Sequence, residues 1–482
     1  MSFGGSFERR ENTQKTLAGA SLLAPSWLPH LFARQSLNVQ PSTAPALPYF
    51  TSTRGDAPAP VSFEDALLHG LAPDGGLFVP ETIPSLAPAG DEAESFPERS
   101  ARVLTPWLAG EIAPETLRAI TDDAFDFPVS LVPLADGDKG GGLDGVHVLE
   151  LFHGPTLSFK DFGARVMARC MSHFMQGRDE HLTILVATSG DTGSAVADGF
   201  AGQPGVEVVL LFPEGQVSPV QERQLVAQRP GVRALAVDGP FDDCQRLVKE
   251  AFQDEELSSA LLLSSANSIN VGRLLPQMLY YVWAAERFDD EMLFCVPSGN
   301  LGNLTAGVLA ARSGLPVRRF LAAHNANDFF PRFLGGGPDE FAASERTLSN
   351  AMDVGAPSNF ERLQWLLSEE ELRETIWGVS VSDGATLQSM RRVYDATGYV
   401  ADPHTAVGLD AVRRYRSETG DETPAVVLST AHPAKFPAVV EDALGFEPDA
   451  PERLAALWNE DTQLEPLAPT LGALREKLLH GA

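Results

Sequence analysis

The hydrophobic and polar positions between residues 147 and 429 form a repeating pattern of short apolar runs and longer segments with helical spacing. The apolar runs are predicted to be strands at residues 147–152, 182–188, 206–212, 232–237, 292–296, 320–324 and 425–429. Helices are predicted between them at residues 161–175, 193–200, 218–228, 241–254 and 304–312. Regular alternation of strands and helices is typical of parallel sheets covered by helices, and ligands bind such sheets at the carboxyl ends of the strands.

The chain before this repeat has a different pattern. Residues 1–47 begin as a polar stretch and continue as an apolar one that Pro25 and Pro29 interrupt. They lack the basic flank and continuous apolar core of a signal peptide, so we predict a disordered or poorly ordered tail, with a targeting segment as the alternative. An edge strand is expected at residues 49–54, where the ordered fold begins.

Further helices are expected on both sides of the repeat. Ser62 and Asp65 have the form of a capping box, which predicts that a helix begins after Ser62. Apolar positions at helical spacing within residues 100–125 predict helical structure there, and residues 355–420 are predicted to be mainly helical. Residues 450–482 are rich in Leu, Ala and Glu and are predicted to be a closing helical segment.

Length and charge restrict the class of protein. A chain of 482 residues is too long for one hydrophobic core, so two or three domains are expected. Its net charge of −29 repels nucleic-acid phosphates and anionic lipids, so neither is an expected partner. The sequence also has no apolar run of about 18 residues that could span a bilayer. An anionic small-molecule substrate would need a locally basic pocket.

The three cysteines, Cys170, Cys244 and Cys295, lie in apolar or helical surroundings and outside any C-x-x-C pattern. We interpret them as buried reduced thiols, not as metal ligands or disulfides, and we predict no metal site. Reduced thiols fit a cytoplasmic location.

Lys160 follows a His-Gly-Pro turn and has Phe159 and Phe162 beside it. Desolvation disfavours the ammonium form and lowers the pKa of a lysine. The neutral amine is a nucleophile that forms Schiff bases with aldehydes such as pyridoxal phosphate. The alternative interpretation is a structural lysine whose stem covers apolar neighbours while its ammonium group reaches water.

The sequence Ala187-Thr-Ser-Gly-Asp-Thr-Gly193 joins a predicted strand to a predicted helix. Ser189 and Thr192 offer hydroxyl groups, Gly190 permits close backbone approach, and the helix N-terminus offers N–H donors. This combination suits a substrate carboxylate. An ordinary capped turn without a ligand is the alternative.

The sequence Val296-Pro-Ser-Gly-Asn-Leu-Gly-Asn-Leu-Thr-Ala-Gly307 also joins a strand to a helix. Its glycines and N–H groups form a nest for anions, and a phosphate is the expected ligand. Its glycine spacing differs from the G-x-G-x-x-G fingerprint, and it lacks the Gly-Lys-Ser/Thr of a Walker A loop. A glycine-rich turn without a ligand is the alternative.

A third motif lies in residues 265–277. Asn267, Ser268 and Asn270 precede Arg273 at a predicted helix start. Arginine binds phosphate bidentately and stays charged when buried, so this motif is a candidate phosphate site. The alternative is a surface cap with a solvated arginine.

A fourth motif, residues 429–436, follows the last predicted strand of the repeat. Thr430 has a neutral hydroxyl that could face a ring nitrogen, and His432 and Lys435 could serve an anion. The alternative is a loop that His432 caps, with Lys435 in solvent.

In their order along the chain, these motifs resemble those of the threonine synthase family, which belongs to the fold-type II enzymes that depend on pyridoxal phosphate. The resemblance covers residues 48–445 or so. It includes the blocks Asp74-Gly-Gly-Leu-Phe-Val-Pro80, Asn325-Ala-Asn-Asp328 and Leu348-Ser-Asn-Ala-Met-Asp353. The Ser-Gly-Asp-Thr-Gly sequence is similar to that of bacterial and fungal members.

The resemblance implies an α/β fold similar to that of the tryptophan synthase β subunit, with two parallel-sheet domains that have helices on both faces. An N-terminal domain would occupy residues 48–135, and the catalytic region would occupy residues 136–460. A mobile small domain would lie at about 163–290, and residues 461–482 would form a C-terminal helical segment. A monomer or homodimer is expected.

The resemblance also implies the cofactor and its surroundings. Lys160 would carry pyridoxal phosphate as a Schiff base, and Thr430 would face the pyridine nitrogen. The implied cofactor-binding residues are Phe159, Lys160, Asp191, Gly299, Asn300, Leu301, Gly302, Asn303 and Thr430. The implied substrate-binding residues are Ser189, Gly190, Thr192, Asn267, Ser268, Asn270, Arg273 and Lys435. Leu301 stands where Phe is more usual, which matters little because only its N–H group would contact phosphate.

The implied reaction converts O-phospho-L-homoserine and water to L-threonine and phosphate, the last step of threonine biosynthesis. Lys160 would be the general base at Cα and would move protons to and from Cβ and Cγ. The alternative within the fold is a β-eliminating or β-replacing relative, such as serine/threonine dehydratase or cysteine synthase. Those enzymes need no site for a substrate phosphate, so the residues from Asn267 to Arg273 distinguish the two possibilities. An inactive homologue that only binds a ligand is disfavoured by the intact Lys160.

Overall fold

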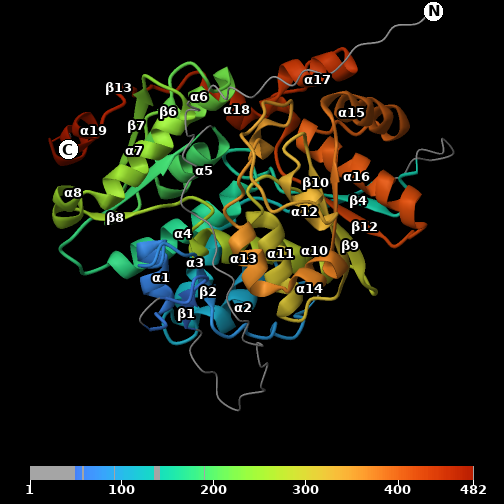
Figure 1. The fold of residues 1–482 in the computed structure, drawn as a ribbon, viewed down its shortest axis with the longest axis horizontal. Helices are drawn as coiled ribbons and strands as arrows, with labels where there is room; N and C mark the ends of the chain where they lie inside the picture. Colours follow the sequence, from blue (N-terminus) through green and yellow to red (C-terminus); the bar gives the residue numbers. More distant parts are fainter. Residues whose placement is uncertain (1–48, 57–58, 92, 135–141, 189, 481–482) are drawn as a thin grey trace, which may run out of the picture. The chain divides into compact units, whose positions relative to one another are not determined.

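The computed structural model describes residues 49–56, 59–91, 93–134, 142–188 and 190–480. The predicted tail at residues 1–47 lies outside this part of the chain. Strands within the described part form a six-stranded sheet, a five-stranded sheet and a two-stranded sheet (Figure 1).

The six-stranded sheet contains the first and last strands of the predicted repeat side by side. In spatial order it is built from β11 (Ile376–Ser380), β10 (Val317–His324), β9 (Met292–Pro297), β12 (Ala425–Ser429), β4 (Val146–Glu150) and β3 (Ser130–Pro133). All neighbours are parallel except β3 and β4, which are antiparallel. The carboxyl ends of β4, β9 and β12, each followed by a predicted motif, therefore meet at one edge.

The five-stranded sheet is parallel throughout. Its order is β13 (Glu465–Leu467), β7 (Val232–Val237), β6 (Val206–Pro213), β5 (Leu182–Ala187) and β8 (Leu262–Ser264). Every residue of β5 is buried, as expected for a parallel strand that is covered on both faces.

Alternate residues of the central strands enter different hydrophobic cores. In β9, Phe294 and Val296 pack in one core, whereas Leu293 and Cys295 pack in another. Both faces of the sheet are therefore covered, which confirms the predicted α/β fold.

The helices after β4 are α4 (Lys160–Met175), α5 (Asp191–Phe200), α6 (Pro219–Val226), α7 (Phe241–Gln253), α8 (Glu255–Ala260), α9 (Val271–Leu274), α10 (Met278–Ala285), α11 (Gly302–Arg312), α12 (Phe329–Leu334), α13 (Phe360–Leu366), α14 (Glu369–Thr375), α15 (Asp383–Thr397), α16 (Pro403–Thr419), α17 (Pro437–Leu444), α18 (Glu452–Leu457) and α19 (Leu471–His480). Short 3₁₀ helices are η2 (Leu275–Gln277), η3 (Asn350–Met352) and η4 (Pro433–Lys435).

The N-terminal region contains β1 (Phe50–Ser52), α1 (Phe63–His69), β2 (Phe78–Pro80), α2 (Phe96–Leu108) and α3 (Pro114–Ala124). Strands β1 and β2 form the antiparallel two-stranded sheet. The expected cap of α1 is present, since the Ser62 hydroxyl accepts a hydrogen bond from the Asp65 N–H at 3.0 Å.

The predicted helical character of residues 100–125 is confirmed, and two helices, α2 and α3, share this stretch. Gly110 has a φ of 85°, a left-handed conformation that glycine adopts without steric cost. Pro114 then begins α3, where its missing N–H group is not needed. The apolar spacing continues across the break between α2 and α3, so the spacing alone does not predict where the first helix ends.

Two strands interrupt segments that were predicted to be helical. β11 lies within residues 355–420, and β13 lies within the predicted closing segments 450–482 and 461–482. Four of the five residues of β11 are only half-buried, and Gly378 interrupts its short apolar stretch. β13 has three residues, including a proline, and is defined by its pairing with β7. These segments are therefore mixed, not purely helical.

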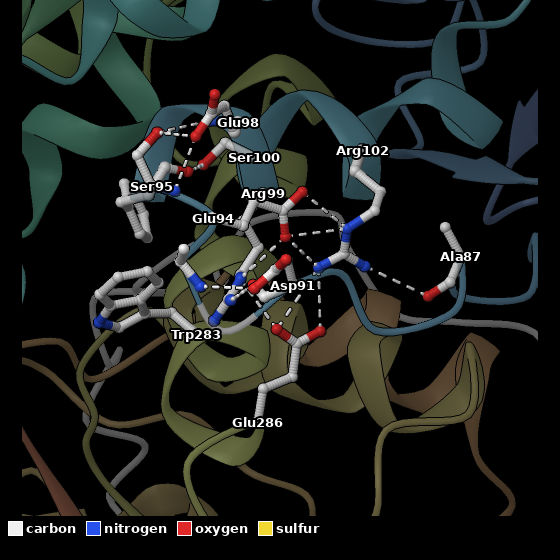
Figure 2. A network of polar contacts seen from close by, with 12 residues as sticks. Ala87, Asp91, Glu94, Ser95, Glu98, Arg99, Ser100, Arg102, Trp283 and Glu286 are labelled. Atoms are coloured by element: carbon white, nitrogen blue, oxygen red, sulfur yellow. Dashed lines mark hydrogen bonds and ion pairs between the residues drawn. The ribbon is translucent and has the colours of Figure 1, made fainter.

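A network of ionised side chains joins the N-terminal region to α10 (Figure 2). Arg102 of α2 lies 2.8 Å from Glu94 and 3.1 Å from Glu286, which follows α10. Arg99 lies 2.9 Å from Glu286 as well, and its side chain is 6% exposed. Arg99 also lies over the ring of Trp283, at 4.9 Å from its centroid.

All three cysteines are buried free thiols. Among the helices of the described residues, none combines the length and the apolar character needed to cross a bilayer. The proposed limits of the N-terminal domain, the small domain and the catalytic region stay predictions.

Candidate active site

The loop between β4 and α4 places Lys160 next to the segment that follows β12. Three contacts hold the loop there: the Phe159 N–H donates to the Thr430 carbonyl at 3.0 Å, the His432 N–H donates to the Leu157 carbonyl at 3.1 Å, and Ser158 forms an isolated bridge with Ala431. Lys160, the first residue of α4, is thus held near Thr430, although the two are far apart in sequence.

Leu157 adopts a φ of 59°, which is unfavourable for a residue with a branched side chain. The tight turn that it forms comes three residues before Lys160. Strain of this kind persists only where surrounding contacts enforce it, and here the contacts to residues 430–432 do so.

The Lys160 side chain is 15% exposed. Its Nζ lies 5.2 Å from the centroid of the Phe159 ring and 3.6 Å from Asp191 Oδ2. Burial lowers the pKa of Lys160, Asp191 opposes this, and the nearby cations Lys435 and Arg273 lower the pKa further. The net lowering favours the neutral, nucleophilic amine.

Phe162 is fully buried and anchors the start of α4. Its ring contacts the rings of Phe96, Phe125, Phe127 and Tyr280. The aromatic residues on the two sides of Lys160 therefore have different roles. The Phe159 ring lies under the Lys160 amine, and Phe162 packs α4 against the N-terminal region and α10.

The turn after β5 is shaped by Thr188 and two glycines. The Thr188 hydroxyl accepts from the N–H groups of Gly190 at 3.1 Å and Gly193 at 2.8 Å. Gly190 has a φ of 143°, and a Cβ on it would lie 2.6 Å from the Gln221 side chain. Thr192 is half-buried in the first turn of α5, where helix N–H groups are available to an anion. Ser189 lies outside the described residues.

Asp191 is the centre of the charged part of the site. Lys435 Nζ lies 2.7 Å from Asp191 Oδ1, and Gln221 Nε2 donates to the same oxygen at 3.1 Å. Burial alone raises the pKa of the Asp191 carboxyl, but Lys435 and Lys160 outweigh it and hold the pKa well below its usual range. Asp191 is therefore ionised at neutral pH.

The glycine-rich turn after β9 has the features of a phosphate cradle. Leu301 adopts a left-handed conformation with a φ of 61°, directly before α11. A Cβ on Gly299 would lie 2.8 Å from the Met352 Cα, so only glycine fits there. The first turn of α11, from Gly302, provides N–H groups for an anion.

Asn303 provides an unsatisfied donor at this turn. Its Oδ1 accepts from the hydroxyls of Tyr280 and Tyr281, both at 2.7 Å. Its Nδ2 is buried and has no hydrogen-bond partner among the described residues. An orphaned buried donor, a close-fitting glycine and a helix N-terminus together fit the phosphate of pyridoxal phosphate.

Ser268 lies beside this phosphate turn, although the sequence places it in another motif. Asn300 Nδ2 donates to the Ser268 hydroxyl, and Asn359 Nδ2 donates to the carbonyls of Ser268 at 3.3 Å and Asn300 at 3.2 Å. Arg362 donates to the carbonyl of Ser268 as well, at 3.2 Å. The two phosphate motifs are therefore adjacent.

Asn270 and Arg273 differ in what they offer a ligand. Asn270 Nδ2 donates to the carbonyls of Leu67 and Ser265, and its Oδ1 accepts from the Gly272 N–H. No donor of the Asn270 amide is left for a substrate, so this side chain fixes the motif to α1. Arg273, in contrast, is 2% exposed, and its Nε is buried without a hydrogen-bond partner among the described residues. Burial lowers its pKa to about 10, which leaves it cationic at neutral pH.

The structure brings most of the predicted residues together. Lys160, Asp191 and Lys435 are in direct contact, Arg273 packs against the first turn of α4 at Gly163, and the Thr430 carbonyl holds the backbone at Phe159. The Lys435 ammonium group pairs with Asp191 and donates to the Thr156 carbonyl, so it is not directed at a separate anion.

Several residues of the site were not predicted from the sequence. Gln221 contacts Asp191, Tyr280 and Tyr281 hold Asn303, and Asn359 joins the phosphate motifs. Gln221 lies in the short helix α6 and carries no local signal. The two tyrosines in the apolar helix α10 were a usable signal, because buried tyrosine hydroxyls require a partner.

Comparisons with known proteins first define the class. Residues 126–431 match a family described as pyridoxal-phosphate-dependent enzymes. Residues 49–125 match the threonine synthase N terminus, and residues 405–477 match the threonine synthase C-terminal region. The fold and the site thus define a fold-type II enzyme that depends on pyridoxal phosphate.

Relatives of known activity narrow this class. The chain is 43% identical to threonine synthase of Escherichia coli over 433 residues, which cover 87% of this chain and 97% of that protein. It is 36% identical to threonine synthase of Saccharomyces cerevisiae, over 85% and 93% of the two chains. The crystal structure of PLP-bound threonine synthase from Brucella melitensis superposes with a TM-score of 0.81 at 36% identity, covering 90% of this chain and 99% of that one. The chain belongs to the threonine synthase family.

Proposed function

We propose that this protein converts O-phospho-L-homoserine and water to L-threonine and phosphate, with Lys160 as the catalytic base. The observation that carries this proposal is the largely buried Lys160 amine of lowered pKa, in contact with Asp191 and held beside Thr430. Membership of the threonine synthase family supports the choice of reaction.

The residues described above fit pyridoxal phosphate. Lys160 would hold its aldehyde carbon, and Gly299, Asn303 and the first turn of α11 would hold its phosphate. Thr430 would face its ring nitrogen with a neutral hydroxyl. When bound, the cofactor supplies an electron sink that makes the substrate Cα proton acidic.

The side chains of the chain then carry out the proton transfers. Lys160 would remove the proton from Cα of the bound substrate and would relay protons to and from Cβ and Cγ. The turn that contains Gly190 and Thr192 would hold the substrate carboxylate. Arg273, together with Asn267, would receive the substrate phosphate, because the unpartnered Nε of Arg273 is a buried cationic donor. Water has to be excluded until the last step, so closure of the predicted small domain at 163–290 belongs to the proposal.

We also propose a cytoplasmic enzyme that acts as a monomer or homodimer and does not bind nucleic acid. The buried free thiols support a reducing compartment. The net charge of −29 disfavours nucleic acid as a partner.

The proposal is tested on purified protein reconstituted with pyridoxal phosphate. We expect a visible absorbance band that borohydride removes, with the reduced label on Lys160. We also expect release of phosphate from O-phospho-L-homoserine with formation of L-threonine. Lys160→Ala should lower the rate by at least about 10²- to 10⁴-fold, the usual contribution of a general base. The exposed Lys249→Ala is the matched control and should leave the rate unchanged.

Two results would contradict this function. Deamination of serine or threonine without phosphate release would indicate a dehydratase-like relative. A colourless protein that takes up no pyridoxal phosphate would remove the basis of the proposal.

A further inference from the structure

The ion pair between Lys435 and Asp191 connects the six-stranded sheet to the five-stranded sheet. Lys435 ends η4, which follows β12 of the six-stranded sheet, and Asp191 begins α5, which follows β5 of the five-stranded sheet. The side chains are 0% and 3% exposed. Lys435 Nζ also donates to the Thr156 carbonyl at 3.0 Å, in the loop that leads to Lys160.

Each oxygen of the Asp191 carboxylate has its own cation. Oδ1 lies 2.7 Å from Lys435 Nζ, and Oδ2 lies 3.6 Å from Lys160 Nζ. Gln221, on α6, adds a neutral donor to Oδ1. Two lysines therefore share one buried carboxylate.

The two lysines cannot have the same task, because the charge of Lys160 changes in the proposed reaction. Lys160 is neutral when it accepts the Cα proton and cationic after it has done so. With Lys160 as its only partner, Asp191 would become an uncompensated buried charge whenever that amine is neutral. A buried carboxylate in that situation takes up a proton, and it would then compete with Lys160 for the proton being transferred.

We propose that Lys435 is a positioning residue that acts as the permanent counter-ion of Asp191, so that this carboxylate stays ionised and directed at Lys160 in both charge states of the Lys160 amine. This inference rests on the proposed function, because it requires Lys160 to be the lysine that moves protons. It gives Lys435 a task other than binding the substrate phosphate.

The other charged groups around Lys160 are placed differently. Arg273 of α9 is a third cation near Lys160, and it makes no ion pair with Asp191. Asp161 of α4 accepts from the Thr156 N–H at 2.9 Å, and burial, aided by Asp198 of α5, raises its pKa to about 6. Lys435 is therefore the group whose removal changes the charge on Asp191 most directly.

The test is a spectrophotometric pH titration of the cofactor band in the holoenzyme. Removing the Lys435 cation in Lys435→Met leaves Asp191 to attract Lys160 alone, so the titration should shift upward by about 1 pH unit or more. Lys435→Arg keeps the charge and should titrate as the unchanged protein does. Removing both charges in the Lys435→Met, Asp191→Asn double variant should return the titration towards its original position.

Controls separate this inference from a structural role and from the proposed function. Lys477→Met removes a lysine that pairs with Glu465 at the surface, and it should not shift the titration. An unshifted titration in Lys435→Met, or an equal shift in Lys435→Arg, would overturn the inference even if both variants lose stability. If borohydride instead labels a lysine other than Lys160, the proposed function fails first, and the inference fails with it.

Discussion

Burial sets the chemistry of individual side chains in this protein. Lys160 and Asp161 are neighbours in sequence. Burial lowers the pKa of Lys160 and raises the pKa of Asp161, so in each case it favours the neutral form. Asp191 is equally buried but has two lysines, and its pKa is lowered instead. The number of cations within reach, more than burial itself, therefore decides which acidic group in the site is ionised.

His324, at the end of β10, allows the effect of burial on stability to be measured. Burial lowers its pKa to about 4, and its Nε2 has no hydrogen-bond partner among the described residues. The unfolded chain binds this proton below about pH 6.5, whereas the folded chain does not until about pH 4. Between these values the unfolded state binds more protons, so stability falls as the pH falls.

We therefore expect protonation of His324 in the unfolded chain to lower the free energy of unfolding by about 2 kcal/mol when the pH is lowered from 7 to 5. His324→Gln should show a pH dependence that is smaller by that amount in urea unfolding at the two pH values. The exposed His181→Gln is the control and should keep the original dependence. An unchanged pH dependence in His324→Gln would contradict the assignment.

The elements of the repeat were predictable because their apolar runs are buried on both faces. The sequence predicted β5, β9 and β12 to within one residue at each end. It did not predict β11 and β13, whose strand character comes from neighbours β10 and β7. Local pattern thus defines the central strands, and tertiary pairing defines the edge strands.

The site was predictable to a similar extent. The phosphate turn stands out in the sequence because several glycines directly follow an apolar strand. Lys160 stands out because a cation lies between two aromatic residues. Asn270 looks equally suited to a ligand in the sequence, but the structure uses its amide to hold α1. Gln221 had no signal at all, since its contact with Asp191 exists only after two helices pack.

The phosphate turn depends on the 3₁₀ helix η3, which packs directly on Gly299. A Cβ at residue 299 would meet the backbone of Met352 and Ala351, at 2.8 and 3.1 Å. The Ala351 N–H donates to His404 Nε2 at 3.2 Å, and His404 Nδ1 lies 2.7 Å from Asp402. The backbone next to the turn is thereby fixed and cannot move aside easily.

We expect Gly299→Ala to weaken the affinity for pyridoxal phosphate by about tenfold or more, since overpacking costs about 1–3 kcal/mol. A spectral titration of the apoprotein with the cofactor measures this. Gly384→Ala is the matched control, because a Cβ there meets no atom within 4 Å. Equal cofactor affinities in the two variants would show that the turn does not hold the phosphate.

At the scale of the whole molecule, buried polar side chains join the N-terminal region to the catalytic region. Arg362 is fully buried and donates to the Phe78 carbonyl of β2 and to the carbonyls of Ser268 and Ile269. The network around Glu286 does the same between α2 and α10 (Figure 2). Arg362 of α13 thus joins the N-terminal region to the backbone of the active-site motif at residue 268.

Glu286→Gln should lower the free energy of unfolding by about 2 kcal/mol, because it removes a charged acceptor that two largely buried arginines share. Chemical denaturation measures the change. Glu250→Gln is the control: its partner Arg246 is on the surface, so a change below about 0.5 kcal/mol is expected. Equal losses in the two variants would mean that the network adds no more than a surface pair.

The position of β12 between β9 and β4 has a consequence for the chain during its synthesis. β4 has β3 on one side, but its other side stays without a partner until β12 leaves the ribosome. At about 5–20 residues per second, the stretch of about 275 residues between β4 and β12 takes about 14–55 s to make. The edge of β4 is open throughout that interval, and the edge of β9 is open from the synthesis of residue 297 onward. These apolar strand edges make the nascent chain a natural client for chaperones.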